Sequence, residues 1–103
     1  METLEVATVT VDSLVGPDEV GLLWIDVEGH EAEVLAGAAA VVAGGARIVV
    51  EASTRAALAL VAALEGSRST FIDLRAGEDA RSLSVLPDYL EALPGRSYTD
   101  ILV

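Results

Sequence analysis

Apolar runs that end in turn residues recur along the chain. Leu22 to Val27 is apolar at consecutive positions until Asp26, which is typical of a strand covered on both faces. Arg47 to Glu51 repeats the pattern as a short β-branched run closed by an acid, and Thr70 to Leu74 is a third run of this kind. The pattern therefore predicts three internal strands.

Amphipathic segments separate these strands. Glu31 to Ala43 carries apolar residues at helical spacing and ends before a Gly-Gly pair that suits a left-handed C-cap. Ser53 or Thr54 can cap a second helix that runs through Glu65. A third, shorter helix is expected over Pro87 to Leu93.

The two ends of the chain also read as strands. Val6 to Val11 alternates apolar and small polar residues, and Asp12 and Ser13 can cap a short helical turn after it. Gly77 to Ser82 is expected to be a polar loop, and Tyr98 to Val103 a terminal strand. Strands that alternate with helices call for an α/β fold with a parallel sheet and right-handed crossovers.

The composition narrows the function classes. The 103 residues suffice for one domain, or part of one, and carry a net charge of −11 from seventeen acids and six basic residues, all of them arginine. Such a surface repels phosphate backbones and anionic lipid headgroups, so neither nucleic acid nor a membrane is an expected partner. The absence of cysteine removes disulfides and thiolate sites, and the cytoplasm is the expected compartment.

The candidate chemistry lies where the first internal strand ends. Asp26 and Glu28 are two residues apart, so in extended backbone they point to one face, where like charges repel. One interpretation is a cationic or hydroxyl-bearing ligand at the strand tip, where open α/β sheets bind their ligands. The other is structural, with Asp26 capping the turn and Glu28 accepting hydrogen bonds from helix N–H groups.

The residues that follow carry similar alternatives. Gly29 either lets a ligand approach the backbone or makes a tight turn, and His30, the only histidine, is either a general base or a solvated or capping residue. Glu31 and Glu33 begin a helix, where carboxylates oppose the positive helix end. Glu51 ends the next strand at the same sheet edge, and three carboxylates there can hold a hard divalent ion, although the spacing assigns no metal.

Several well-known motifs are absent from the sequence. There is no G-x-G-x-x-G or G-x-x-x-x-G-K-[ST] loop for a dinucleotide or nucleoside triphosphate, and no G-x-S-x-G nucleophile turn. A receiver-like signalling module also alternates strands and helices with an acid at a strand tip. A resemblance to such domains would require a lysine near that acid, and this chain has no lysine.

A family resemblance is carried by the stretch TVTVDSLVGPDEVGLLWIDVEGHEAEVLAGAAAVVAGGARIVVEAS, which begins at Thr8. From there to about Glu51 it resembles the FkbM-type S-adenosylmethionine-dependent methyltransferases. These carry a T-L-D-S-L-like segment, then K-I-D-V-E-G-x-E-x-x-V-L-x-G-A, then an apolar strand closed by Glu. YTDILV at Tyr98 to Val103 also resembles the family's closing strand, whereas Trp24 stands where the family usually has lysine.

The resemblance implies the C-terminal half of a Rossmann-like class I methyltransferase fold, a mostly parallel sheet with an antiparallel closing strand. Leu22 to Val27 and Arg47 to Glu51 would be its fourth and fifth strands. The family's upstream half, with its glycine-rich cofactor loop and ribose-holding acid, has no counterpart here, so residues 1–103 are expected to be a partial domain. Leu22 to Val27 then becomes an exposed apolar edge that invites pairing with another chain.

The activity implied is methyl transfer from S-adenosylmethionine to a hydroxyl of a small molecule or glycan. The resemblance implies catalytic roles for Asp26, Glu28 and His30, cofactor contacts by Asp26 and Gly29, and acceptor contacts by Glu28, Glu31 and Glu51. The expected partners are the acceptor and either a second copy or the missing N-terminal half. The alternative function is a noncatalytic α/β interaction module that dimerises through the exposed strand edge.

Overall fold

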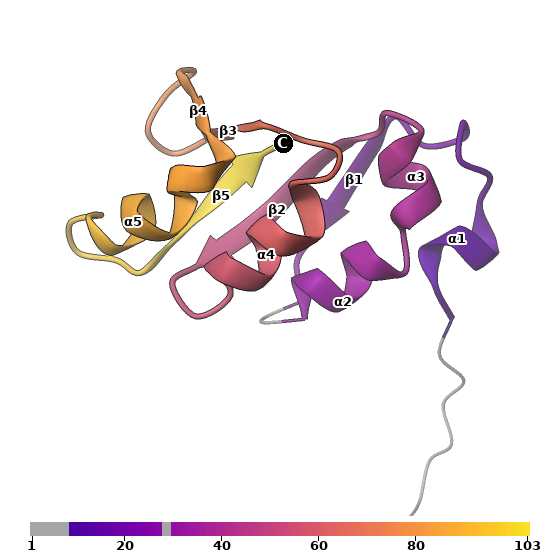
Figure 1. The fold of residues 1–103 in the computed structure, drawn as a ribbon, viewed down its shortest axis with the longest axis horizontal. Coiled ribbons are helices and arrows are strands. Elements are labelled where there is room, and N and C mark those ends of the chain that lie inside the picture. The colour runs from indigo at the N-terminus through magenta and orange to yellow at the C-terminus, as the bar shows by residue number, and fades with distance from the viewer. Residues whose placement is uncertain (1–8, 28–29) are drawn as a thin grey trace, which may run out of the picture.

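The protein is an α/β unit with one five-stranded sheet, seen in a computed structural model that describes residues 9–27 and 30–103 (Figure 1). The strand order is β1-β2-β5-β3-β4. The strands are β1 (Leu22–Ile25), β2 (Arg47–Ser53), β3 (Thr70–Asp73), β4 (Ala80–Ser82) and β5 (Tyr98–Leu102).

The helices are short and cover one face of this sheet. In Figure 1, α4 lies in front of β2, and α2 and α5 lie on either side of α4. The helices are α1 (Val11–Leu14), α2 (Glu31–Ala36), α3 (Ala39–Ala43), α4 (Ala57–Leu64) and α5 (Leu86–Glu91), with the 3-10 turn η1 (Leu83–Val85) before α5. No helix in the described ranges has the length and apolar character needed to cross a membrane.

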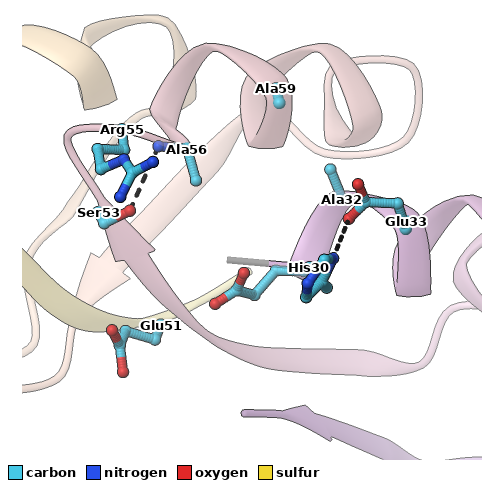
Figure 2. A pocket seen from close by; sticks show the side chains of 9 residues that line it. His30, Ala32, Glu33, Glu51, Ser53, Arg55, Ala56 and Ala59 are labelled. Atoms are coloured by element: carbon cyan, nitrogen blue, oxygen red, sulfur yellow. Dashed lines mark hydrogen bonds and ion pairs between the residues drawn. The ribbon is translucent and has the colours of Figure 1, made fainter. Parts of the chain in front are cut away.

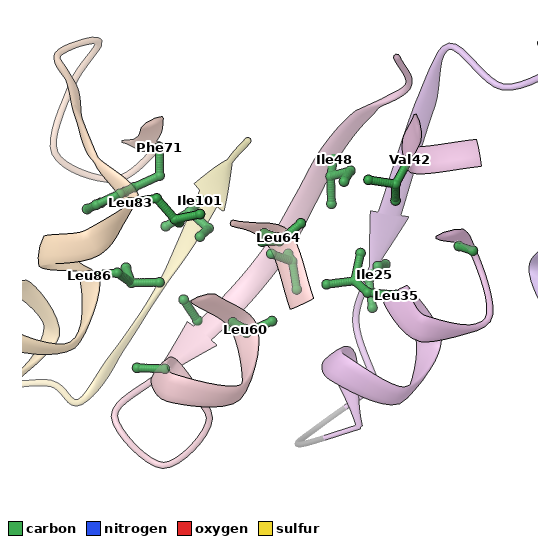
Figure 3. Packing of buried hydrophobic residues seen from close by; sticks show 14 of the residues in the cluster. Ile25, Leu35, Val42, Ile48, Leu60, Leu64, Phe71, Leu83, Leu86 and Ile101 are labelled. Atoms are coloured by element: carbon green, nitrogen blue, oxygen red, sulfur yellow. The ribbon is translucent and has the colours of Figure 1, made fainter. Parts of the chain in front are cut away.

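The hydrophobic core lies between the helices and the sheet. Ile48 and Val50 of β2 are fully buried against Leu60 and Leu64 of α4, and Phe71 of β3 fills the part of the core beside η1 and α5 (Figure 3). Alternate residues of a strand point to opposite faces, so each strand supplies every second residue to this core. The large core residues are aliphatic except for Phe71.

The prediction of a mostly parallel sheet is wrong. Only β1 and β2 pair in parallel, whereas β2 with β5, β5 with β3, and β3 with β4 are antiparallel. The reason is the insertion of the last strand, β5, between β2 and β3, which run in the same direction. In addition β4, which forms within the segment expected to be a loop, turns back on β3 as a hairpin.

The helix predicted over 31–43 is two helices. The main-chain N–H groups of Ala40 and Val41 donate to the carboxylate of Asp12 at 2.9 and 3.2 Å, so Asp12 caps α3 rather than its own turn. The turn that contains Asp12 is capped by Thr10, whose hydroxyl accepts from the N–H of Ser13 at 3.2 Å. The two helices are separated by Gly37–Ala38, and a long-range cap starts the second one.

Other predicted elements are confirmed with shifted ends. The expected left-handed position after the 31–43 segment falls on Gly45, whose φ is +94°. Ser53 closes the turn before α4 by accepting from the N–H of Ala56 at 3.3 Å, and the helix itself starts at Ala57. Half of the strand predicted over Val6 to Val11 lies outside the described residues, and its described half is wrong because it forms no strand and Val11 begins α1.

The first internal strand is exposed on one side, contrary to the expectation that both its faces are covered. Ile25 is 3% exposed and faces the helices, whereas Trp24 is 70% exposed. β1 is also the first strand of the order, so within the described chain one of its edges has no neighbour. The expectation of an exposed apolar edge is therefore confirmed.

Candidate functional site

The candidate site lies at the sheet rim where β1 and β2 end. Because these strands are parallel and Ile25 pairs with Val50, the next residues, Asp26 and Glu51, occupy neighbouring positions of this rim. They lie at the same end of the sheet, as predicted, but the prediction that Glu51 ends its strand is wrong, because β2 continues to Ser53 in its pairing with β5. The chain then turns from β1 into α2 and from β2 into α4, so both helix starts border the same rim.

A hollow of about 550 Å³ opens at this rim (Figure 2). It is bounded by the start of α2, the end of β2 and the first residues around α4. Its lining residues are His30, Glu31, Ala32, Glu33, Glu51, Ser53, Arg55, Ala56 and Ala59. Three carboxylates and one imidazole therefore surround it, with Arg55 as the one arginine in the described lining.

His30 sits at the N-terminal boundary of α2 and faces solvent. Its side chain is 75% exposed and makes no capping hydrogen bond, so the capping interpretation does not apply. Its Nδ1 lies 3.6 Å from Oε2 of Glu33, one helical turn on, which is itself 72% exposed. An exposed imidazole beside a carboxylate can exchange protons with a ligand in the hollow.

The two other carboxylates of the lining differ in environment. Glu31 is 3% exposed in the first turn of α2, where the positive helix end favours a negative group. Glu51 is half-buried on β2, on the side away from α4 (Figure 2), and pairs in register with Asp100 of β5. The Nε of Arg75 lies 3.2 Å from Oδ2 of Asp100, which offsets the repulsion between these two acids.

The sequence did not single out Arg55 as a site residue. It lies in the turn between β2 and α4, exposed, and follows the strand by two residues. An arginine just after a strand end is the same kind of sequence signal as Asp26, because each follows the carboxyl end of a strand. Ser53, predicted only as a cap, also lines the hollow.

The predicted site residues are brought together only in part. His30, Glu31 and Glu51 line one hollow, whereas Asp26 is exposed and does not appear in its described lining. Glu28 and Gly29 lie outside the described residues, so their predicted roles stay predictions. Among residues 9–27 and 30–103, no three His, Cys, Asp or Glu side chains form a group that could hold a metal ion.

A second polar cluster lies at the end of β3 and was not predicted. The buried carboxylate of Asp73 accepts hydrogen bonds from the hydroxyls of Thr99 and Tyr89, both at 2.5 Å, and from the N–H of Arg75 at 2.9 Å. Burial raises the pKa of Asp73, but these bonds and the charge of Arg96 outweigh it, so its pKa lies below the ordinary 3.8. The cluster ties β3, β5 and α5 together.

Comparison with known proteins gives one match. A family described as "Methyltransferase FkbM domain" matches residues 1–76 of the 103. No curated protein matches the chain, and no solved structure does. The matched segment includes β1, α2, β2 and the whole of α4, and so contains every element that borders the hollow.

Proposed function

The chain belongs to the FkbM methyltransferase domain family, and we propose that it forms the acceptor-side part of a methyltransferase that uses S-adenosylmethionine. The reaction proposed is methylation of a hydroxyl on a small molecule or glycan. The observation that carries this proposal is the family match over residues 1–76, which covers the strands and helix starts around the hollow.

The lining of the hollow fits one part of the cofactor. S-adenosylmethionine carries a positively charged sulfonium, and Glu31, Glu33 and Glu51 provide a negative surround for a cation. When bound, the cofactor supplies an electrophilic methyl group. The sequence has no G-x-G-x-x-G turn, and β1 lies at a sheet edge, so we expect this chain alone to bind the cofactor weakly.

His30 is the proposed general base. Its exposed imidazole borders the hollow, with Nδ1 3.6 Å from the carboxylate of Glu33, and can accept the proton of a hydroxyl bound there. Glu31 and Glu51 are proposed to contact the acceptor together with Glu28, and Arg55 adds a hydrogen-bond donor at the same opening. Asp26 and Glu28 are proposed to contribute to catalysis, with Asp26 and Gly29 beside the cofactor.

Calorimetry with S-adenosylmethionine tests the proposal that this chain is one part of a larger cofactor-binding domain. We expect no saturable binding at micromolar concentrations for the 103-residue chain, and saturable binding for a protein extended by the in-frame sequence encoded upstream. Micromolar binding by the chain alone would contradict the partial-domain proposal. If the extended protein also fails to bind, the cofactor assignment is wrong.

Transfer of a labelled methyl group from S-adenosylmethionine into small-molecule and glycan extracts tests the residue roles in the extended protein. His30→Ala is expected to lower the rate by about 10² to 10⁴ while cofactor affinity is kept, as for loss of a general base. Glu65→Gln, an exposed acid at the end of α4, is the matched control and should leave the rate unchanged. Equal losses in both variants would remove His30 from the mechanism.

A second candidate function is a noncatalytic module that dimerises through the free edge of β1. Its supporting observation is that Leu22 and Trp24, 52% and 70% exposed, lie on an edge strand. Sedimentation of the 103-residue chain separates the two candidates. A tight dimer with no cofactor binding in any longer form favours the module, whereas a monomer that gains cofactor binding on extension favours the enzyme.

A further inference from the structure

The polar lining of the hollow continues from β2 onto β5. Glu51 and Ser53 line the hollow from β2 (Figure 2), and they pair in register with Asp100 and Tyr98 of β5. Side chains of paired residues stand on the same face of a sheet, with their Cβ atoms about 5 Å apart. Asp100 and Tyr98 therefore lie directly beside the lining residues, on the neighbouring strand.

Arg75, the second residue after β3, contacts both of these β5 side chains. Its Nε lies 3.2 Å from Oδ2 of Asp100, and its guanidinium carbon lies 5.4 Å from the centre of the Tyr98 ring. The main-chain N–H of Arg75 donates to the buried Asp73 at 2.9 Å, which fixes the backbone at this point. We call Arg75, Tyr98 and Asp100 the rim cluster. Within it the side chains of Tyr98 and Arg75 remain 40% and 44% exposed.

The rim cluster lies at the end of the sheet rather than over its middle. Tyr98 is the first residue of β5 and pairs with Ser53, the last residue of β2, whereas β1 reaches only to the level of Val50. At about 3.3 Å per residue, the row of Ser53 and Tyr98 lies about 10 Å beyond the end of β1. Open α/β sheets bind their ligands at this end of the strands. The exposed tyrosine is therefore placed for a ligand that extends from the hollow.

The groups that the rim cluster leaves unused indicate the kind of ligand. Within the described chain, the terminal nitrogens of Arg75 and Oδ1 of Asp100 make no hydrogen bond, so donors and an acceptor stand side by side. The two charges offset each other, so a charged ligand gains little net attraction, whereas neighbouring hydroxyls can bond to both groups. The face of an aromatic ring is negative and attracts C–H groups. A neutral sugar ring, with C–H groups on its face and hydroxyls around its edge, matches these features.

We propose that the rim cluster is an acceptor subsite that binds a neutral sugar ring beside the hollow. Tyr98 packs on the C–H face of the sugar, and Arg75 and Asp100 bond to its hydroxyls. This inference rests on the proposed methylation at the hollow and narrows the acceptor to a glycan or glycoside. The three residues determine specificity and take no part in the transfer of the methyl group.

Saturation-transfer NMR of the 103-residue chain tests the subsite without cofactor. The probes are the methyl glycosides of glucose, galactose, mannose and rhamnose. We expect saturable transfer to the C–H protons of at least one of them, and weaker transfer to methyl glucuronide, which is anionic, and to adenosine, which is planar and aromatic. Absence of transfer to every neutral glycoside, or equal transfer to methyl glucuronide or adenosine, would overturn the proposal.

Two pairs of variants locate the binding surface. Tyr98→Ala should abolish the transfer, whereas Tyr98→Phe keeps the ring and should retain it. Arg75→Gln keeps the main-chain bond to Asp73 and should also lose the transfer. Its control is Arg47→Gln, an exposed arginine at the other end of β2, which should leave the transfer unchanged. Equal effects of Arg75→Gln and Arg47→Gln would overturn the proposal even if Tyr98→Ala fails to fold.

Kinetics of the protein extended by the upstream in-frame sequence separate this inference from the proposed function. For a methyl glycoside acceptor, Tyr98→Phe should leave KM unchanged and Arg75→Gln should raise KM with kcat kept, as for loss of uniform binding. Methyl transfer only to acceptors without a sugar, unaffected by Arg75→Gln, would remove the subsite and keep the enzyme. Sugar binding that depends on Tyr98, in an extended protein without cofactor binding, would keep the sugar site and remove the enzyme.

Discussion

At the scale of single residues, Asp73 is the buried charge on which packing between β3, β5 and α5 depends. It is fully buried, and both of its oxygens accept hydrogen bonds, Oδ1 from Thr99 and the N–H of Arg75, and Oδ2 from Tyr89. Bonds to a charged acceptor contribute more to stability than neutral ones. The carboxylate therefore acts as a structural tie between three elements.

Replacing this carboxylate by an amide tests the tie. Asp73→Asn keeps the size of the side chain but turns one oxygen into a donor that faces another donor, so we expect the free energy of unfolding to fall by about 3 kcal/mol. Urea denaturation measures the change. Asp88→Asn, an exposed acid on α5 next to Tyr89, is the control and should shift the stability by less than about 0.5 kcal/mol.

We expect the contribution of the Asp73 carboxylate to the stability of the folded protein to be lost in acid. Its folded pKa is below 3.8, so above that value its charged form stabilises the folded state, and this contribution is lost as the pH falls through the lowered folded pKa. The stability gap between wild type and Asp73→Asn should thus narrow between about pH 5 and pH 2. A gap that stays constant over this range would show that the charge of Asp73 is not what stabilises the cluster.

The sequence predicted the rim better than this cluster for a physical reason. Asp26, His30 and Glu31 follow one strand within a few residues, so local pattern alone brings them to its carboxyl end. Asp73 meets Tyr89 and Thr99 across 16 and 26 residues, and such contacts are set by which strands become neighbours. Nothing in the local pattern around Thr70 to Leu74 signals that choice.

At the scale of elements, the capping of α3 by Asp12 decides where the 31–43 segment breaks. Asp12 lies 28 residues before Ala40, whose N–H it accepts at 2.9 Å. The Cα position of Gly37 approaches the side chain of Thr10, so a Cβ there would stand 3.1 Å from the Cβ of Thr10. The turn that contains Thr10 and Asp12 therefore packs against the break between α2 and α3. Asp12 caps α3 from a distant part of the sequence, so the two helices do not continue into one another.

Removal of this cap should destabilise the protein measurably. Asp12→Ala leaves the N–H groups of Ala40 and Val41 without their acceptor, and we expect a loss of about 1 kcal/mol in the free energy of unfolding. Hydrogen exchange should show faster exchange of these two amides. Asp18→Ala, an exposed acid in the following loop, serves as the control, and an equal loss there would contradict the capping role.

The types of the longer elements were predictable, although β4 forms in a predicted loop and Val11 begins a helix, whereas strand neighbours were not predictable. Short apolar runs predicted β1, β2 and β3 within a few residues, because each run is long enough to fill one strand. The direction and place of β5 depend on the whole chain, since Tyr98–Leu102 enters between two strands that the alternation of elements would have made adjacent. Alternating strands and helices predict a parallel sheet. The alternation does not reveal that the last strand, β5, enters between β2 and β3.

At the scale of the whole molecule, the helices and the sheet form two layers, and the second face of the sheet is outside the core. The core cluster contains Ile25, Ile48 and Val50 but not Trp24, the strand neighbour of Ile25. Sheets built from strand–helix units ordinarily have helices on both faces. Trp24, at 70% exposure, is therefore the largest apolar side chain of β1 and one that the helices of the described chain leave uncovered.

This one-sided arrangement predicts opposite outcomes for two adjacent residues of β1. Ile25→Ala, at 3% exposure against the helices, should lower the free energy of unfolding by about 2 to 4 kcal/mol, whereas Trp24→Thr, at 70% exposure, should cost less than about 1 kcal/mol. Threonine keeps the preference for extended backbone, so the comparison isolates packing. Urea denaturation of the monomer measures both changes. A cost for Trp24→Thr as large as that for Ile25→Ala would mean that the open face is already packed in the isolated chain.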